Sequence, residues 1–463
     1  MFDTGVIFAD MNPTDFSLAP SAACGAAGHS RRTVLFGLGG ALCALGMGAH
    51  PALAANTSAP DDSSLTALLD GLAAALTADA GHAAQQQALR TAAAQLGGIR
   101  PEKLSSDGRV LLAAVRDGIE TEAALLSGAG QAGSYALALR LNAGPGLSPH
   151  EAHQWGQARV RALQAEADRI LRAQGLTSGT VAERLRAFWR DPRHLYPNTE
   201  DGRRRAVEAM NAQLAATRER LGQAFRNLSP AELVVSTLPP EQASKATVGK
   251  RIDPSADGTR PGGYVVDLRE IERRPAWTLP SVVHHELAPG HLLQAPFKER
   301  AHAHPVQQRY AKGYSEGWAI YAEQLAAEQG WLGQGWLGDD PLARLGYIHW
   351  MLFRTGRLVA DTGIHALGWS AQQAIDAVRE IQGEPVAFIT IEEDISRMVA
   401  NPGAAAGQML AAACLSRLRD DAQARLGARF TLAGFHEAVL RHGPLSNPGL
   451  EAAVKNWIET ASA

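Results

Sequence analysis

The stretch from His284 to His291 constrains the fold and chemistry of this chain more than any other. It reads His-His-Glu-Leu-Ala-Pro-Gly-His, so imidazoles flank a carboxylate, and Glu316 follows 25 residues after the last histidine. Catalytic zinc sites use three protein ligands and leave a further position open, and a nearby carboxylate can act as the base for water. We therefore predict that His285, His291 and Glu316 bind one Zn²⁺ ion. Glu286 is then the candidate general base.

The spacing of the two histidine ligands differs from that of the common zinc motif, in which they stand at i and i+4. His285 and His291 are six residues apart, which places them about 240° apart around an ideal helix. A straight helix therefore cannot direct both at one ion. Pro289 and Gly290 lie between them, and proline interrupts a helix while glycine permits unusual dihedral angles. We expect a kink at this step that returns His291 to the metal.

Other pairings of these histidines are open. His284 and His291 share one face of an ideal helix, but they lie about 10 Å apart along its axis, too far for one zinc ion. His284 and His285 are adjacent and point apart. We expect His284 to be a neighbour of the site. A buried helix whose histidines bind no metal is the alternative.

The third ligand should come from a following helix. Glu316 and Glu323 are seven residues apart, on one helical face but about two turns apart, so we expect only one of them to bind the ion. We choose Glu316, while Glu323 could orient a ligand histidine from behind. For either glutamate the alternative is a plain surface residue. His302 and His304, which lie between the two motifs, are interpreted as loop residues.

Polar residues also recur on a later helix. Arg357, Asp361 and His365 stand at i, i+4 and i+8 on an otherwise apolar helix, which gives one polar face. Hydrolysis of an amide needs a donor for the negative charge that develops on the carbonyl oxygen. Arg357 and His365 are the candidate catalytic residues for that role, and a surface Arg–Asp pair is the alternative. The strand expected over 264–268 could bind an extended peptide by its edge.

Helical periodicity dominates the chain after its first 60 residues. Capping boxes at Ser148–Glu151 and Thr180–Glu183 mark the starts of two helices. Short strands are expected only over 232–236 and 263–268. The predicted fold class is mainly α with a small β element. We divide the chain into a leader over 1–54, an N-terminal helical region over 55–230 and a zinc-binding catalytic region over 231–463, the last two expected to form one continuous fold.

The first 54 residues have the features of an export signal. Arg31 and Arg32 precede an apolar run, and a small-residue cleavage site ends at Ala54. These parts match a twin-arginine signal peptide, so we expect the twin-arginine export machinery as a partner and a periplasmic or secreted mature protein. A chance arginine pair before a buried helix is the alternative. The apolar run is too short for a membrane span, so none is expected in the mature chain. Leu42 is too large to precede a lipidated cysteine at Cys43.

Charge and cysteine content exclude several classes of function. The formal net charge is −3, so no basic excess favours binding to nucleic acid. Removal of the leader would leave Cys414 as the one remaining cysteine. The mature chain could then form no internal disulfide. We expect Cys414 to be a buried thiol.

Four motifs together resemble the bacterial domain-of-unknown-function 885 family (DUF885), which is grouped with the thermolysin-like (gluzincin) zinc metallopeptidases. The matching segments are His285–His291, Glu316–Glu323, Arg357–Trp369, and Phe435–Glu437 with Gly443–Leu445. The resemblance covers most of residues 60–460. It implies a zincin-like helical metallopeptidase fold with a central cleft, the same three ligands and the same base.

One segment departs from the family pattern. Family members usually carry Pro-x-Gln-Ala-x-x-Tyr-x-x-Gly near the C-terminus, but this chain has Ala404, Gln408 and Ala411 at the Gln, Tyr and final Gly positions. If the tyrosine binds substrate, specificity or activity is altered here. We predict an exported zinc-dependent hydrolase that cleaves peptide or related amide bonds in small substrates. The alternatives are an amidohydrolase or maturation enzyme that acts on a secreted metabolite, and a non-catalytic protein that keeps the metal site.

Overall fold

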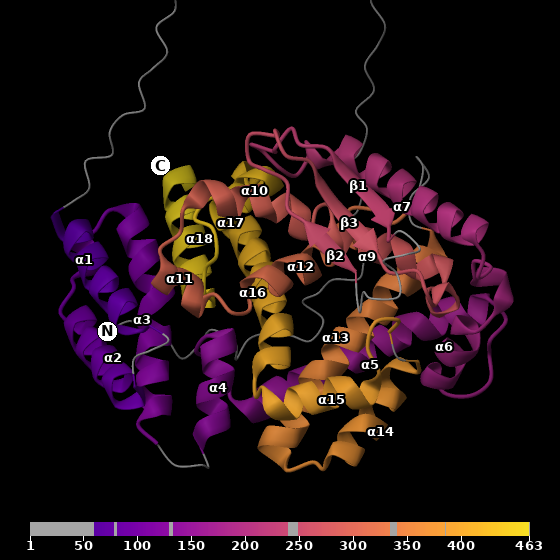
Figure 1. The fold of residues 1–463 in the computed structure, drawn as a ribbon, viewed down its shortest axis with the longest axis horizontal. Helices are drawn as coiled ribbons and strands as arrows, with labels where there is room; N and C mark the ends of the chain where they lie inside the picture. The colour runs from indigo at the N-terminus through magenta and orange to yellow at the C-terminus, as the bar shows by residue number, and fades with distance from the viewer. Residues whose placement is uncertain are drawn as a thin grey trace, which may run out of the picture.

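The computed structural model describes residues 60–77, 81–128, 133–238, 249–333, 340–384 and 386–462. Within them the chain is mainly helical with one small sheet, as expected (Figure 1). The expected leader over 1–54 lies outside the described residues. In the described ranges, no helix combines the length and the apolar character that a membrane crossing requires.

Helices precede the sheet. They are α1 (Pro60–Ala75), α2 (His82–Gly97), α3 (Ser106–Leu126), α4 (Ser134–Ala143), α5 (Pro149–Ala173), α6 (Val181–Trp189) and α7 (Glu200–Leu221). Both predicted capping boxes are present: Ser148 pairs with Glu151 at the start of α5, and Thr180 pairs with Glu183 at the start of α6. Each box satisfies backbone N–H groups that a helix start leaves without partners, which fixes where the two helices begin.

The sheet has three strands in the order β1-β3-β2. Strand β3 (Gly262–Val266) is parallel to β1 (Leu233–Thr237) and antiparallel to β2 (Lys250–Ile252). The two predicted strands are confirmed, whereas β2 was not predicted, because three residues are too few to show a period. Since β3 is paired on both sides, the expectation that it binds a peptide by its edge is wrong. The outer edge of the sheet next to β3 belongs to β2.

Helices also follow the sheet. They are α9 (Leu279–Glu286), α10 (His291–Ala301), α11 (Pro305–Tyr310), α12 (Tyr314–Glu328), α13 (Pro341–Leu367), α14 (Ala371–Gln382), α15 (Ile391–Ala400), α16 (Ala404–Leu426), α17 (Leu432–Leu440) and α18 (Asn447–Ser462). The break between α9 and α10 falls at the Pro289–Gly290 step, where a kink was predicted.

One apolar core joins the helices before and after the sheet. Helix α13 packs along α5, α16 packs on α12 and α4, and α18 packs on α3. The buried apolar cluster extends from Leu65 to Ile458. Cys414 is buried within it as a free thiol, as predicted. The core therefore crosses the boundary at residue 230, and the long helix α13 packs against both α9 and α12 (Figure 1).

His349 on α13 is a buried polar side chain among aromatic rings. Its ring centroid lies 4.6 Å from that of Trp189 and 5.9 Å from that of Trp277. Neither ring nitrogen has a hydrogen-bond partner in the described part of the chain. Burial lowers the pKa of His349 to about 3. Since the ordinary value is about 6.5, the unfolded chain takes up this proton first as the pH falls.

We predict that His349→Phe stabilises the protein, because the change removes two buried nitrogens without partners and keeps a ring. The free energy of unfolding should rise by about 1–2 kcal/mol at pH 7.5. The difference in free energy of unfolding between the variant and the parent should grow by about 1.4 kcal/mol per pH unit below about 6.5. In the parent, protonation of His349 favours the unfolded state in acid, and the variant lacks this group. Urea unfolding at pH 7.5, 6.5 and 5.5 measures both effects.

His436 provides the matched control. Burial also lowers its pKa to about 3, but Nδ1 lies 2.7 Å from the Ala224 carbonyl oxygen and Nε2 lies 2.9 Å from the Tyr321 hydroxyl. His436→Phe should therefore destabilise the protein at pH 7.5 while reducing its acid sensitivity to the same degree. A destabilised His349→Phe protein at pH 7.5 would contradict the prediction.

Candidate metal centre

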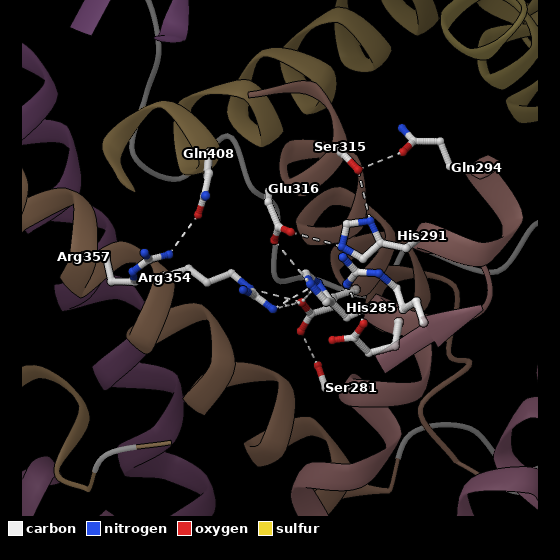
Figure 2. A network of polar contacts seen from close by, with 12 residues as sticks. Ser281, His285, His291, Gln294, Ser315, Glu316, Arg354, Arg357 and Gln408 are labelled. Carbon is white, nitrogen blue, oxygen red and sulfur yellow. Dashed lines mark hydrogen bonds and ion pairs between the residues drawn. The ribbon is translucent and has the colours of Figure 1, made fainter. Parts of the chain in front are cut away.

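Three side chains from three helices meet at one point. His285 comes from the end of α9, His291 from the start of α10 and Glu316 from the first turn of α12, and one ligand atom of each lies within 4.8 Å of the others. Glu316 Oε2 is 3.5 Å from His285 Nε2, and Oε1 is 3.3 Å from His291 Nε2 (Figure 2). The structure therefore brings together the three residues that the sequence predicted as ligands.

The break between α9 and α10 makes this meeting geometrically feasible. Helix α9 ends at Glu286, and the backbone turns before α10 begins at His291. A Cβ atom at Gly290 would stand 2.0 Å from the His285 carbonyl oxygen, so the tight turn requires glycine. Trp318 on α12 donates a hydrogen bond from Nε1 to the Pro289 carbonyl oxygen at 2.9 Å. As a result, the two histidine rings face each other edge to face, with centroids 4.8 Å apart.

Glu323 contacts His285 on the side away from Glu316, the position that the seven-residue spacing predicted. Its Oε1 lies 2.8 Å from His285 Nδ1 and 2.7 Å from Arg354 Nη2, and its Oε2 accepts a hydrogen bond from Ser281 at 2.5 Å. A histidine that donates from Nδ1 to a carboxylate presents its Nε2 lone pair in the opposite direction. Glu323 thus aims His285 Nε2 at the cluster.

His291 carries a buried nitrogen that lies 3.3 Å from Glu316 Oε1 but forms no well-aligned hydrogen bond among the described residues. Its Nδ1 lies 3.2 Å from Ser315 Oγ. Its Nε2 is buried and has no hydrogen-bond partner among the described residues, although it faces Glu316 and His285. Buried polar atoms are almost always satisfied. A cation at the centre of the three side chains would satisfy this nitrogen, and two nitrogens with one carboxylate form a donor set that suits zinc.

The protonation states of the cluster respond to the same contacts. Burial and Arg354 both oppose a charge on His285, but hydrogen bonds to Glu316 and Glu323 outweigh them and raise the pKa of His285 to about 9. Burial lowers the pKa of His291. Burial opposes ionisation of Glu316, yet its close contacts with both histidines hold its pKa well below the ordinary range. Without a metal, the cluster therefore holds a proton on His285, which a bound cation would replace.

The cluster opens into a cavity of about 890 Å³. Glu286 lines this cavity, and its Oε2 lies 2.7 Å from Arg251 Nη1 on β2. The cavity wall combines many charged side chains with an aromatic surface. Its other charged and aromatic members are Lys250, Asp253, Arg260, Tyr264, Arg274, Trp350, Phe353, Arg354, Arg357, Phe388, Asp394 and Arg397. The predicted base thus lies beside the predicted ligands in a space large enough for a small substrate.

Residues 124–454 match the model of a family described as a bacterial protein of unknown function, DUF885. The chain belongs to this family. No curated protein matches the chain.

Two solved structures resemble this DUF885 protein. One is described as a candidate lipoprotein from Colwellia psychrerythraea; it is 29% identical over 86% of this chain and 70% of the other, with a TM-score of 0.64. The other is described as a candidate lipoprotein of unknown function from Shewanella oneidensis; it is 14% identical over 87% of this chain and 98% of the other, with a TM-score of 0.63. The second likeness concerns the fold alone.

His284 and the C-terminal DUF885 motif lie outside the cluster. His284 Nε2 lies 3.1 Å from Thr217 Oγ1, and burial lowers the pKa of His284 to about 4. It is a buried neighbour of the ligands, as predicted. His436 contacts the Ala224 carbonyl oxygen and Tyr321 instead of the cluster. These two buried histidines link α9 to α7 and α17 to α12.

The predicted polar face of α13 separates into two parts. Arg357 lines the cavity, where Nη1 donates to Gln408 Oε1 at 2.8 Å and Nε lies 3.0 Å from Asp394 Oδ2. Asp361 accepts hydrogen bonds from two backbone N–H groups at the start of α16. His365 Nε2 lies 3.0 Å from the Met398 carbonyl oxygen, and His365 is not among the residues that line the cavity.

The structure does not bring His365 to the cluster, so its assignment as a catalytic donor has no geometric support. The physical reason is the rise of the helix. Eight residues of α-helix separate His365 from Arg357 by about 12 Å along the axis, so one polar face can serve two different sites.

Of the three departures from the DUF885 pattern, Gln408 faces the cavity. Arginine can only donate hydrogen bonds, so Arg357 must bind the Gln408 oxygen, which leaves the amide NH₂ as a free donor. Ala411 instead packs against α12, where a Cβ atom at Gly317 would stand 2.6 Å from the Ala411 Cβ. The departure at Gln408 therefore changes the cavity wall, while that at Ala411 changes helix packing.

Sequence reasoning missed most of the residues that line the cavity, and four of them bear directly on its charge and hydrogen bonding. They are Arg251, Tyr264, Arg274 and Arg354. For Arg354 a clue existed, because it precedes Arg357 by one helical turn in an apolar helix, and such a pair shares a face. For the other three the sequence gave no clue, because their places depend on the sheet.

Proposed function

We propose that this protein is an exported zinc-dependent hydrolase that cleaves peptide or related amide bonds, with the fold and central cleft of the thermolysin-like zinc metallopeptidases. One observation carries the proposal. Ligand atoms of His285, His291 and Glu316 lie within 4.8 Å of one another, and Glu286 lines the same cavity. The lipoprotein description of the similar structure from Colwellia psychrerythraea supports export from the cytoplasm.

The side chains of the site have distinct roles in this mechanism. A bound zinc ion would supply Lewis acidity, which polarises a carbonyl oxygen and makes water easier to deprotonate. Glu286 takes the proton from the attacking water and passes it to the leaving nitrogen. Arg251 binds Glu286 Oε2, while no described residue donates to Oε1, so Oε1 is the atom that carries the proton. Glu323 holds His285 in the orientation that the ligand needs.

Arg357 and Gln408, which line the same cavity as Glu316, can stabilise the negative charge that develops on the carbonyl oxygen. Arg357 holds the Gln408 amide with its NH₂ group free to donate (Figure 2). Fixed donors that meet a developing oxyanion contribute strongly because they need no reorganisation. We assign this role to Arg357 and Gln408 together, in place of the pair Arg357 and His365.

One alternative is a non-catalytic protein that keeps the metal site. The ion pair between Glu286 and Arg251 favours it, since a base held by arginine is less available for proton transfer. The other alternative, an amidohydrolase that acts on a secreted metabolite, uses the same ligands and base. It differs from the lead proposal in substrate alone.

Metal analysis of the mature protein, combined with digestion of a peptide library, tests the proposal. We expect one zinc ion per chain and cleavage products that disappear when a chelator is added and return with zinc. Zinc at one ion per chain without cleavage of peptides would favour the alternatives, and a panel of N-acylated metabolites would then separate them. A protein that takes up no zinc would refute the proposal.

A further inference from the structure

Arg274 is a buried cation that pairs with no carboxylate of the described residues. Arg274 follows the short helical turn Ile271–Arg273, and 8% of its surface is exposed. It lines the same cavity as His285 and Glu286. Among the described residues, none forms a hydrogen bond or ion pair with its guanidinium group. Two carboxylates influence it, Asp267 and Glu286, but other arginines bind both of them.

The other buried arginines of the cavity are paired. Arg354 binds Glu323 at 2.7 Å, and the half-buried Arg357 lies 3.0 Å from Asp394. An unpaired buried charge costs several kcal/mol, and arginine stays protonated at any physiological pH. Burial lowers the pKa of Arg274, which is the direction expected of a cation that lacks an anion. The cavity therefore has a place for an anionic group beside Arg274.

An aromatic surface lies next to this cation. Phe388 is 44% exposed, stacks on Trp350 with centroids 6.2 Å apart and meets Phe353 edge to face at 6.0 Å. Phe388 and Arg274 also line a second cavity of about 320 Å³, so the ring and the cation border the same two spaces. Exposed aromatic rings of this kind gain free energy when an apolar group covers them.

We propose that Arg274 binds the free carboxylate of the substrate and that the Trp350–Phe388 surface binds the apolar side chain next to that carboxylate. The substrates are then short peptides or N-acyl amino acids that end in a large apolar residue. Guanidinium matches the planar carboxylate with two parallel hydrogen bonds. This inference rests on the proposed hydrolase function, because it names the substrate class for that site.

The kinetic test uses two substrates that differ in one group. The zinc-loaded protein is given hippuryl-L-phenylalanine or its C-terminal amide, and kcat/KM is measured for each. We expect the free acid to be preferred by at least about 100-fold, since loss of one partner of a buried charged pair has effects of this size. In Arg274→Met the preference should fall to within about threefold, because only the acid loses its partner.

Two further variants complete the kinetic test. Arg274→Lys keeps the charge but loses the planar fork, so it should retain part of the preference. Arg260→Gln is the matched control: Arg260 lines the same cavity, but it is largely exposed and bonds to the Asp253 carbonyl oxygen. Arg260→Gln should keep the preference of the parent. If Arg260→Gln and Arg274→Met lost the preference for the free acid equally, Arg274 would not be the residue that binds the carboxylate.

A binding measurement separates this inference from the hydrolase proposal. Calorimetry compares N-acetyl-L-phenylalanine, its amide and phenyl phosphate on metal-depleted protein, so that neither turnover nor coordination to zinc contributes. In the parent, the acid should bind at least about tenfold more tightly than the amide. In Arg274→Met, the acid and the amide should bind with equal affinity. If the acid is preferred in binding but no substrate is hydrolysed, the hydrolase proposal is refuted and the role of Arg274 in binding a carboxylate stands. Equal binding of acid and amide to the parent would overturn the role of Arg274, and phenyl phosphate binding more than about tenfold tighter would overturn the choice of a carboxylate.

Discussion

A Glu286→Gln variant is expected to bind zinc as tightly as the parent and to lose hydrolysis by about 10²–10⁴-fold. Glutamine has the size of glutamate and can still accept a hydrogen bond from Arg251, which lies 2.7 Å from Glu286 Oε2. It cannot take a proton from water at neutral pH. Glu286 is also not one of the three clustered ligand residues, so the metal should remain. Zinc content and initial rates, measured on the same preparation, test both halves of the prediction.

Glu299→Gln is a suitable control for this variant. Glu299 is exposed, and its carboxylate contacts the backbone N–H of Ala256 near the sheet. The change removes the same charge from the same region, so zinc content and rate should stay at the parent values. Parent-like hydrolysis by Glu286→Gln would exclude Glu286 as the base. Loss of zinc from Glu286→Gln would instead mean that Glu286 helps to hold the ion.

The parts of the site that local sequence determines were predictable. Proline and glycine together disfavour a continuous helix, so the break between His285 and His291 was predictable from backbone chemistry. The seven-residue spacing of Glu316 and Glu323 similarly placed one carboxylate at the cluster and the other behind it, because helix geometry fixes the distance between them. The capping boxes of α5 and α6 were predictable for the same reason.

The remaining parts depend on contacts between segments far apart in the sequence. Strand β2 has three residues, and it forms only because β3 offers it a partner. Arg251 and Arg274 reach the cavity through the sheet and the turn that follows it, so no spacing in the sequence connects them with Glu286. His365 was misassigned because periodicity identifies a face of a helix but not which neighbour covers it. Met398 and Tyr135 cover His365 in the structure.

The second large effect concerns the two carboxylates of α12. Replacing Glu316 should mainly remove zinc binding, whereas replacing Glu323 should mainly reduce stability. Glu316→Gln should abolish stoichiometric zinc binding and turnover, because Glu316 supplies the oxygen of the donor set, and His291→Ala should have the same outcome. Glu323→Gln should retain zinc with affinity lowered by about 10–100-fold, as expected when the group behind a ligand histidine is lost. Competition with a chelator of known zinc affinity measures these differences.

The free energy of unfolding should fall more in Glu323→Gln than in Glu316→Gln, the reverse of their effects on zinc binding. Glu323 is fully buried and pairs with the buried Arg354 at 2.7 Å, so Glu323→Gln leaves an arginine without an anion. Breaking a buried pair in this way costs about 3–5 kcal/mol. Glu316 is partly exposed, and among the described residues its ion pairs are with the two histidines, so Glu316→Gln should cost less than Glu323→Gln in metal-free protein. Urea unfolding in the presence of a chelator measures both values. If the two variants lost zinc affinity equally and stability equally, the division between a ligand carboxylate and an orienting carboxylate would be wrong, and with it the geometry on which the hydrolase proposal depends.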